Sequence, residues 1–417
     1  MKPQVSKKIL VAAVAGNALE FYDFVAYAFF AVYIGKAFFP ATTTASSLLV
    51  AVTVFGVGFL SRPFGGIFIG VFADRVGRKP AMLLTVALIT VGTLAIGLTP
   101  THDTIGMAAP AIIVVARLVQ GLALGGEVGP STAFLVEAAP QHRRGLYGSW
   151  QVASQGIATF VAGGLGLGLA ATLTPAEMQA WGWRVPFLFS LLLVPVALYL
   201  RNAMPETLHS LDADPPPASG DQANKAKVVW LAVLVVAGGT VSTYVGAYMT
   251  TYAVTTLKLP PTTSLAATVL MGFSTILFAL LGGWLSDRFG RKPVMFWPRL
   301  AVTVLIVPAF THLVAHPSLG ALLFVTTVLA ALTAISAAAS LVAIPEMLPR
   351  HFRATGLSIA YAIGVSIFGG STQLGVTWLL NAGAGPLTPA LYVAGASAVA
   401  ALAMLAMPES AKLELAD

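Results

Sequence analysis

The sequence predicts an all-α integral membrane protein with twelve transmembrane helices, arranged as two related six-helix bundles. Three observations support this fold class. The chain of 417 residues contains 57% hydrophobic and only 9% charged residues. Its apolar runs are about twenty residues or longer, which is the length of a helix that crosses a bilayer. The phrase Asp-Arg-x-Gly-Arg-Lys-Pro occurs twice, at 74–80 and at 287–293.

The composition excludes a soluble domain, because soluble domains carry about 25% charged residues. A mean hydropathy of +0.85 means that much of the surface must face lipid. Only helices and closed barrels satisfy their backbone groups there. Barrel strands would alternate over about ten residues, and the longer apolar runs favour helices. The chain has no cysteine, which excludes disulfides, thiolate catalysis and Cys-ligated metals.

The expected spans follow one another along the whole chain. The first is too long for the core of a signal peptide and contains two acidic residues, so we expect an uncleaved span. The predicted spans lie at 9–35, 46–72, 81–100, 107–137, 147–172, 184–201, 228–256, 264–286, 294–314, 319–345, 354–381 and 388–407.

One segment between the spans is rich in proline, small and charged residues, which is typical of a flexible linker. We therefore expect an N-terminal six-helix bundle at 1–201, a cytoplasmic linker at 202–227 and a C-terminal six-helix bundle with a short cytoplasmic tail at 228–417.

Lys and Arg concentrate in alternate connections. If the N-terminus lies inside, most of the 23 Lys and Arg residues fall in inner segments, and the outer segments hold only Lys36, Arg184 and Lys258. The positive-inside rule then places both termini in the cytoplasm. The same distribution explains the net charge of +7 as membrane topology rather than nucleic-acid binding.

Three phrases occur twice in the same order and at a nearly constant offset. They lie at 70–80 and 283–293, at 137–144 and 346–353, and at 204–207 and 407–410. All of them fall on the predicted cytoplasmic side. Two halves with the same orientation imply a pseudo-two-fold axis along the membrane normal, with a substrate site near the midplane between the halves.

The duplicated phrase resembles the signature of the major facilitator superfamily, which is Gly-x-x-Ala-Asp-Arg-x-Gly-Arg-Lys after the second span. Within that superfamily the chain resembles the metabolite:proton symporters, on residues 16–24, 62–65, 117–127 and 181–187. Residues 149–155, 356–361 and 368–370 look most like the citrate and tricarballylate branch. The resemblance implies the major facilitator fold and proton-driven import of a carboxylate.

Three carboxylates are expected at membrane depth, namely Glu20, Asp23 and Glu127. A charge at the bilayer centre costs about 2.5–3.5 kcal/mol on insertion scales, so such residues usually face a water-filled cavity and serve a function there. A carboxylate in a partly dry cavity binds protons more readily. These three are our candidates for proton coupling. The alternative is structural: Glu20 or Asp23 pairs with Arg117, or Glu127 locks helix packing.

Arg117 is the deep cation of the fourth span, and a guanidinium binds carboxylates through a fixed fork of donors. We expect it either to anchor an anionic substrate or to form an internal salt bridge. The glutamines of the fifth span could contact substrate or bond between helices. We expect the second half, with Arg299 near the start of its span, to offer mostly neutral contacts. The predicted substrate-binding residues are Asn17, Tyr27, Arg117, Gln120, Gln151, Gln155, Tyr244 and Tyr248.

The duplicated loops carry acids as well as bases, and the positive-inside rule does not require the acids. The resemblance implies a cytoplasmic gate of charge pairs that holds the halves together when closed and breaks on opening. The predicted gate residues are Asp74, Arg78, Glu137, Arg144, Glu206, Asp287, Arg291, Glu346 and Arg353.

The sequence lacks the patterns of an enzyme: it has no metal-spaced histidine pair, no phosphate-binding glycine loop and no nucleophile elbow. We predict a proton-coupled symporter that takes up a small organic anion, a di- or tricarboxylate such as citrate. Two alternatives stay open, a symporter of a betaine-like osmolyte and a non-transporting sensor or channel. We expect protons as the coupling ion and no other cofactor or metal. We also expect a monomer in the bacterial inner membrane, with contacts to lipid but not to nucleic acid.

Overall fold

The computed structural model describes residues 7–39, 43–76, 78–125, 131–132, 135–136, 139–202, 222–348 and 350–411. All regular secondary structure within these residues is helical, which confirms the predicted fold class. Most of the predicted linker lies outside them, and so do three predicted site residues, Glu127, Glu137 and Glu206.

The first half of the chain contains long helices joined by short ones. Its helices are α1 (Lys7–Phe29), α2 (Ala31–Phe38), α3 (Thr44–Leu60), α4 (Arg62–Val76), α5 (Arg78–Leu98), α6 (His102–Ile105), α7 (Ala108–Gly125), α9 (Arg144–Gly148), α10 (Trp150–Thr172), α11 (Pro175–Ala180) and α12 (Val185–Asn202). Short 3-10 helices precede α9 and α12.

The second half contains longer and simpler helices. They are α13 (Gln222–Thr255), α14 (Pro261–Phe289), α15 (Arg291–Ala315), α16 (Leu319–Glu346), α17 (Arg350–Asn381) and α18 (Thr388–Ala406). The helix α13 begins six residues earlier than the expected span, inside the predicted linker.

Each predicted span overlaps a long helix or two consecutive helices, although for the fourth span, 107–137, the described helix α7 covers only 108–125. Nine helices of the described residues are long and apolar enough to cross a membrane, and the bent pair α1–α2 could make a tenth. The two remaining spans correspond to α5 and α12. The bend of 68° in the first span was not predicted, because neither proline nor glycine stands at the break. The helix is interrupted at Phe30, whose φ of −101° and ψ of 12° are not helical.

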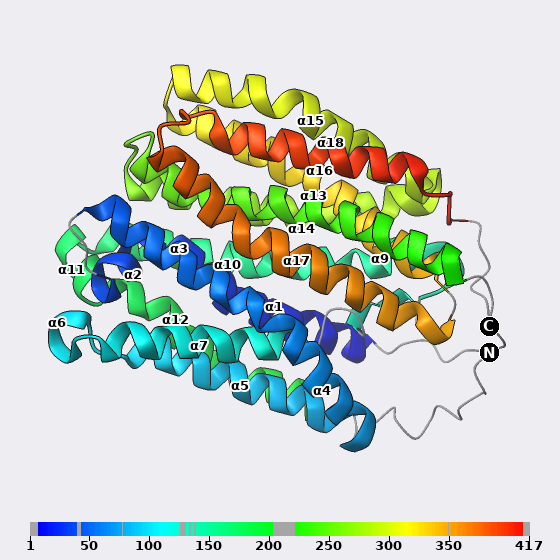
Figure 1. Cartoon of the computed structure of the whole chain (residues 1–417), viewed down its shortest axis with the longest axis horizontal. Helices are drawn as coiled ribbons and strands as arrows, with labels where there is room; N and C mark the ends of the chain where they lie inside the picture. Colours follow the sequence, from blue (N-terminus) through cyan, green and yellow to red (C-terminus); the bar gives the residue numbers. More distant parts are fainter. Residues whose placement is uncertain are drawn as a thin grey trace.

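The helices of the two halves run along the same axis and form two adjacent groups. In Figure 1, α1 to α12, in blue to green, lie below α15, α16 and α18, in yellow to red, while α17, in orange, slopes across the boundary between the two groups. The most extensive contacts between the groups are those of α10 with α14 and of α3 with α17, and smaller ones include α9 with α14. The short helices α2, α6 and α11 gather at one end, and α9 lies at the other. We call the second end the predicted cytoplasmic end, because the duplicated loops lie there.

Glycines allow the closest contacts between the halves. A Cβ added to Gly272 of α14 would lie 2.3 Å from the backbone nitrogen of Phe160 of α10. A Cβ added to Gly56 of α3 would lie 2.8 Å from the carbonyl oxygen of Gly370 of α17. Small residues at such crossings let two membrane helices approach and gain packing contacts. Both seams between the halves therefore depend on the absence of a side chain.

Candidate functional site

A cavity of about 130 Å³ lies between the two halves. Its walls come from α1 and α10 of the first half and from α13 to α17 of the second. The lining residues lie in the middle of α13 and α17, and they also include residues near the start of α10 and the end of α16. Most of the polar lining consists of hydroxyl groups, including those of Thr159, Thr240, Thr243, Thr275, Thr333 and Ser340.

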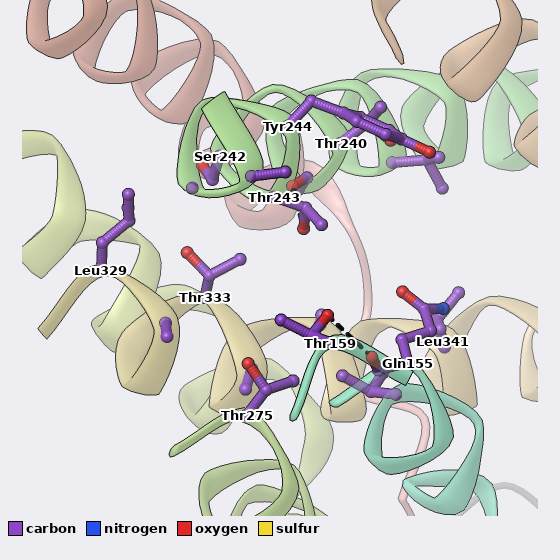
Figure 2. Close-up of a pocket in the computed structure, with 18 of the residues that line it drawn as sticks. Gln155, Thr159, Thr240, Ser242, Thr243, Tyr244, Thr275, Leu329, Thr333 and Leu341 are labelled. Carbon is purple, nitrogen blue, oxygen red and sulfur yellow. Dashed lines mark hydrogen bonds between the residues drawn. The ribbon is translucent and has the colours of Figure 1, made fainter. Parts of the chain in front are cut away.

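The polar side chains face one another across the cavity. Figure 2 shows Thr240, Thr243 and Tyr244 of α13 on one side, with Thr159 and Gln155 of α10 on the opposite side. The Thr159 hydroxyl donates a 3.0 Å hydrogen bond to the backbone oxygen of Gln155. The hydroxyl oxygen of Thr333 is buried and has no hydrogen-bond partner among the described residues. It is therefore available to a bound solute.

Arg299 is the only charged side chain among the described residues that line the cavity. It extends from α15 and is only 1% exposed. Its Nη1 donates to the Ser242 hydroxyl at 3.0 Å and to the Gly238 carbonyl at 3.3 Å. The second half therefore supplies a cation to the cavity, in addition to the neutral contacts that the sequence predicted.

A second polar group lies inside the first half, away from the cavity wall. Arg117 donates from Nη1 to Gln120 Oε1 at 2.8 Å, and Gln120 donates from Nε2 to the Thr93 hydroxyl at 2.9 Å. Thr93 in turn donates to Asp23 Oδ2 at 2.6 Å. Two neutral side chains thus connect the buried guanidinium to the buried carboxylate. The described residues place no carboxylate within ion-pair distance of Arg117.

Aromatic rings lie between this chain of hydrogen bonds and the cavity. The Arg117 guanidinium carbon stands 4.7 Å from the ring centre of Phe24 and 5.1 Å from that of Phe55. The ring of Tyr244, which lines the cavity, lies 5.9 Å from Phe24 and 6.0 Å from Phe55. Phe59 completes the cluster, at 5.3 Å from Tyr244. The rings of Phe24, Phe55, Phe59 and Tyr244 form what we call the aromatic cluster.

Several predicted substrate residues bond between helices instead of lining the cavity. Asn17 of α1 donates to the Ser154 hydroxyl of α10, and Gln151 Nε2 donates to Asn17 Oδ1 at 3.0 Å. The Tyr27 hydroxyl donates to the Ala51 carbonyl at 3.2 Å. Only Gln155 and Tyr244 of the predicted set line the cavity, whereas Asn17, Tyr27, Arg117, Gln120, Gln151 and Tyr248 do not.

Three of the predicted gate residues of the second half, Asp287, Arg291 and Glu346, meet at the predicted cytoplasmic end. Arg291 forms ion pairs with Asp287 at 2.8 Å and with Glu346 at 3.0 Å, so all three charges belong to the second half. The contact that crosses between the halves is different. Asp287 accepts hydrogen bonds from the backbone N–H groups of Gly145 at 2.7 Å and Leu146 at 2.9 Å. Here a carboxylate bonds to backbone amides at the start of α9, where the sequence predicted side-chain charge pairs.

The other predicted gate and coupling residues are less fully described. Arg144 is buried beside this contact. Four predicted residues lie in helices, but their side chains are outside the described part of the structure: Glu20, Asp74, Arg78 and Arg353.

Sequence reasoning missed Thr93 and Thr333, because a single threonine in an apolar span carries no distinctive signal. It noted Arg299 but assigned no role to it. The rule that intramembrane charges are functional pointed to that residue.

Comparison with known proteins gives a consistent family. The family model described as sugar (and other) transporter matches residues 8–213 and 221–417. A citrate-proton symporter of Klebsiella pneumoniae is 35% identical over 401 residues, which cover 94% of this chain and 90% of that protein. A proline/betaine transporter of Escherichia coli is 31% identical, covering 98% of this chain and 85% of that protein. An alpha-ketoglutarate permease of Escherichia coli is 34% identical, and the match covers 87% of this chain and 85% of that protein.

Solved structures show the same fold at lower identity. A crystal structure of a D-xylose-proton symporter superposes with a TM-score of 0.76 at 18% identity, covering 98% of this chain and 99% of that one. A partially occluded inward-open form of a xylose transporter from Escherichia coli has a TM-score of 0.73 at 17% identity, covering 97% and 98%. The fold is therefore that of the major facilitator transporters. Because the family model and relatives above 30% identity span nearly its whole length, the chain belongs to the sugar (and other) transporter family.

Proposed function

We propose that this chain is a proton-coupled symporter that takes up a small organic anion, a di- or tricarboxylate such as citrate, by alternating access. The observation that carries the proposal is the buried chain from Asp23 through Thr93 and Gln120 to Arg117, beside a polar cavity between the halves. Relatives described as a citrate-proton symporter and an alpha-ketoglutarate permease support the substrate class.

Asp23 is the proposed proton carrier. Its Oδ2 accepts from Thr93, and its Oδ1 is buried without a partner among the described residues. In a medium of low dielectric constant, adding a proton to a carboxylate changes the local field far more than it would in water. Arg117 experiences this change through two polarisable hydrogen-bonding side chains. Protonation of Asp23 would therefore weaken the interaction between Arg117 and the hydrogen-bonded side chains that connect it to Asp23.

The aromatic cluster offers a physical connection between the proton site and the cavity. Phe24 follows Asp23 on α1, and its ring contacts both the Arg117 guanidinium and the ring of Tyr244. Tyr244 lies on α13 of the second half and lines the cavity. A shift of Arg117 would move rings that pack across the interface between the halves. In this proposal, the halves rock about the cavity, and the Asp287 contact with Gly145 breaks when the predicted cytoplasmic end opens.

A betaine-like zwitterion is the second candidate substrate. A proline/betaine transporter is 31% identical to this chain. The rings of Phe21, Tyr244 and Tyr361 line the cavity, and aromatic faces bind quaternary ammonium groups. A zwitterion would place its ammonium group on these rings and its carboxylate elsewhere in the cavity.

Transport by the purified full-length protein in proteoliposomes tests the proposal. The solutes to compare are citrate, tricarballylate, succinate, 2-oxoglutarate and betaine, each with and without an inward proton gradient. We expect one or more of the carboxylates to accumulate only with the gradient. Accumulation that ignores the gradient would contradict proton coupling, and a preference for betaine would contradict the organic-anion assignment. We also propose a monomer in the bacterial inner membrane, with cytoplasmic termini and no cofactor besides the coupling proton.

A further inference from the structure

We propose that Arg299 is the residue that anchors a carboxylate group of the transported solute, which assigns to α15 the role that the sequence suggested for Arg117. The inference rests on the proposed uptake of an organic anion. It divides the work between two buried arginines: Arg117 belongs to the proton-sensing chain of the first half, and Arg299 recognises the solute.

The surroundings of Arg299 lack a counter-ion among the described residues. Its described hydrogen-bond acceptors are a backbone carbonyl at Gly238 and a hydroxyl at Ser242, and both are neutral. Ser242 also lies 3.4 Å from Ser397, oxygen to oxygen, so the local network stays neutral. A buried cation without an anion is costly in a protein interior and more so at membrane depth. A bound carboxylate would remove that cost.

One edge of the guanidinium remains available for such an anion. Nη1 makes both of the described hydrogen bonds, whereas Nε has no partner among the described residues. Nη2 likewise donates no hydrogen bond within the described part of the chain. Nε and Nη2 form the edge that binds a carboxylate with two parallel hydrogen bonds. Gly239 lies beside this edge: a Cβ added there would be 3.5 Å from Nη2, so residue 239 itself places no side chain against that nitrogen.

The cavity supplies further groups for the rest of a polar solute. Thr333 offers a buried hydroxyl without a described partner, and Gln155 offers an amide from the opposite half. Arg299 and Gln155 both line the cavity, so a solute with two polar ends could contact both halves at once. Such a bridging solute would favour the closed arrangement of the halves, as a transporter with a site at their interface requires.

Arg117 is placed differently from Arg299. It does not line the cavity, and its guanidinium packs on Phe24, Tyr27 and Phe55. Its Nη1 is bonded to Gln120. A solute in the cavity would have to displace the aromatic cluster to reach it, whereas Arg299 is already part of the wall.

The test measures solute affinity and transport separately in the full-length protein. Arg299→Gln and Arg299→Lys are compared with wild type and with Arg184→Gln. This matched change lies outside the cavity, in the 3-10 helix before α12, where Arg184 bonds to backbone carbonyls. Binding of citrate and tricarballylate is measured in detergent by calorimetry, and counterflow in proteoliposomes is measured without a proton gradient. We expect Arg299→Gln to weaken carboxylate binding about tenfold to a hundredfold. Arg299→Lys should retain part of the affinity, because it keeps the charge but loses the fork.

The outcomes separate this inference from the proposed function. If wild type binds and exchanges a carboxylate while Arg299→Gln binds it as tightly as Arg184→Gln does, the anchor assignment is wrong and the proposed function stands. If wild type handles no carboxylate of the panel, the proposed function fails and the anchor fails with it. Should Arg299→Gln not fold, Thr333→Val and Arg299→Lys decide, because unchanged affinity in both would overturn the assignment.

Discussion

Asp287 of α14 accepts a 2.7 Å hydrogen bond from the backbone N–H of Gly145, which lies in α9 of the other half. The same carboxylate accepts from Leu146 and pairs with Arg291. One residue of the second copy of the duplicated phrase thus connects its own half to the other. The close approach of α9 and α14 supports the contact, since Gly145 and Gly283 leave no side chain between the two backbones.

Replacing Asp287 with Ala should open the predicted cytoplasmic end. Hydrogen bonds to a charged group contribute about 1.5–3 kcal/mol each, and the substitution removes two that cross between the halves. Because the chain has no cysteine, two introduced cysteines can carry spin labels on α9 and α14 without background labelling. We expect longer label distances and slower uptake. Asp103→Ala, at the opposite end, is the control, and an unchanged distance distribution in Asp287→Ala would refute the gate.

Thr93→Val should impair proton coupling while leaving solute exchange in place. Thr93 is the residue that joins Asp23 to Gln120, and valine cannot donate or accept either hydrogen bond. We expect uphill uptake driven by a proton gradient to fall about tenfold, with counterflow reduced much less. Asp23→Asn should show the same split more strongly.

The matched control for this change lies one turn earlier on the same helix. The described hydrogen bond of the Thr90 hydroxyl goes to the Val86 carbonyl of its own helix. Thr90→Val therefore removes a hydroxyl without changing the hydrogen bonds that connect Asp23 to Arg117. Equal losses of gradient-driven uptake in Thr93→Val and Thr90→Val would show that the hydrogen-bond chain plays no part in coupling.

Glu409, in the segment after α18, bonds to the start of α15, and we expect the stability of this junction to fall at acidic pH. Burial raises the pKa of Glu409, but backbone hydrogen bonds from Ala411, Arg291, Lys292 and Ser410 outweigh it and hold the pKa below its usual range. A carboxylate with a lowered pKa stabilises the fold above its unfolded-state pKa, and this stabilisation is lost as the pH falls through the folded-state value.

Thermal unfolding measured across the acidic range tests this expectation. Wild type should lose stability as the pH falls below the ordinary range for a glutamate, and Glu409→Gln should show a smaller change over the same range. Glu177→Gln is a useful comparison, because Glu177 caps the short helix α11, and hydrogen bonds from Thr174 hold its pKa below the usual value as well. Identical pH profiles for wild type and Glu409→Gln would contradict the proposed role of Glu409.

The sequence predicted the helices well because span length and composition are properties of single segments. The resemblance to the family implied charge pairs among gate residues that include Asp287, Arg291 and Glu346, and the structure brings these three together. The sequence did not predict that Asp287 would bond to backbone amides of the other half, because a backbone amide leaves no trace in the pattern of residue types. Gly145 was therefore overlooked as the partner of Asp287.

The placement of the cavity could not be predicted from the spans alone. Arg117 and Arg299 are both deep arginines in the sequence, and the rotation of each helix about its own axis decides which one faces the interface. Helical periodicity is a weak guide here, because each helix carries apolar residues on several faces. The neighbouring helices determine the rotation, through contacts such as Gly56 with Gly370 that are remote in sequence.

A final prediction concerns the seam between α10 and α14. Gly272→Ala places a Cβ 2.3 Å from the backbone nitrogen of Phe160, so one of the helices must move. Overpacking of this kind typically costs about 1–3 kcal/mol. We expect a lower thermal unfolding temperature in detergent and reduced transport, because the halves can no longer close along this seam. Gly168→Ala is the matched control: this glycine lies on α10 with nothing within 4 Å of an added Cβ, and alanine is the better helix former. Its unfolding temperature should equal or exceed that of wild type. If Gly272→Ala matches Gly168→Ala in both stability and transport, then the close approach of α10 and α14 is not what holds the halves together.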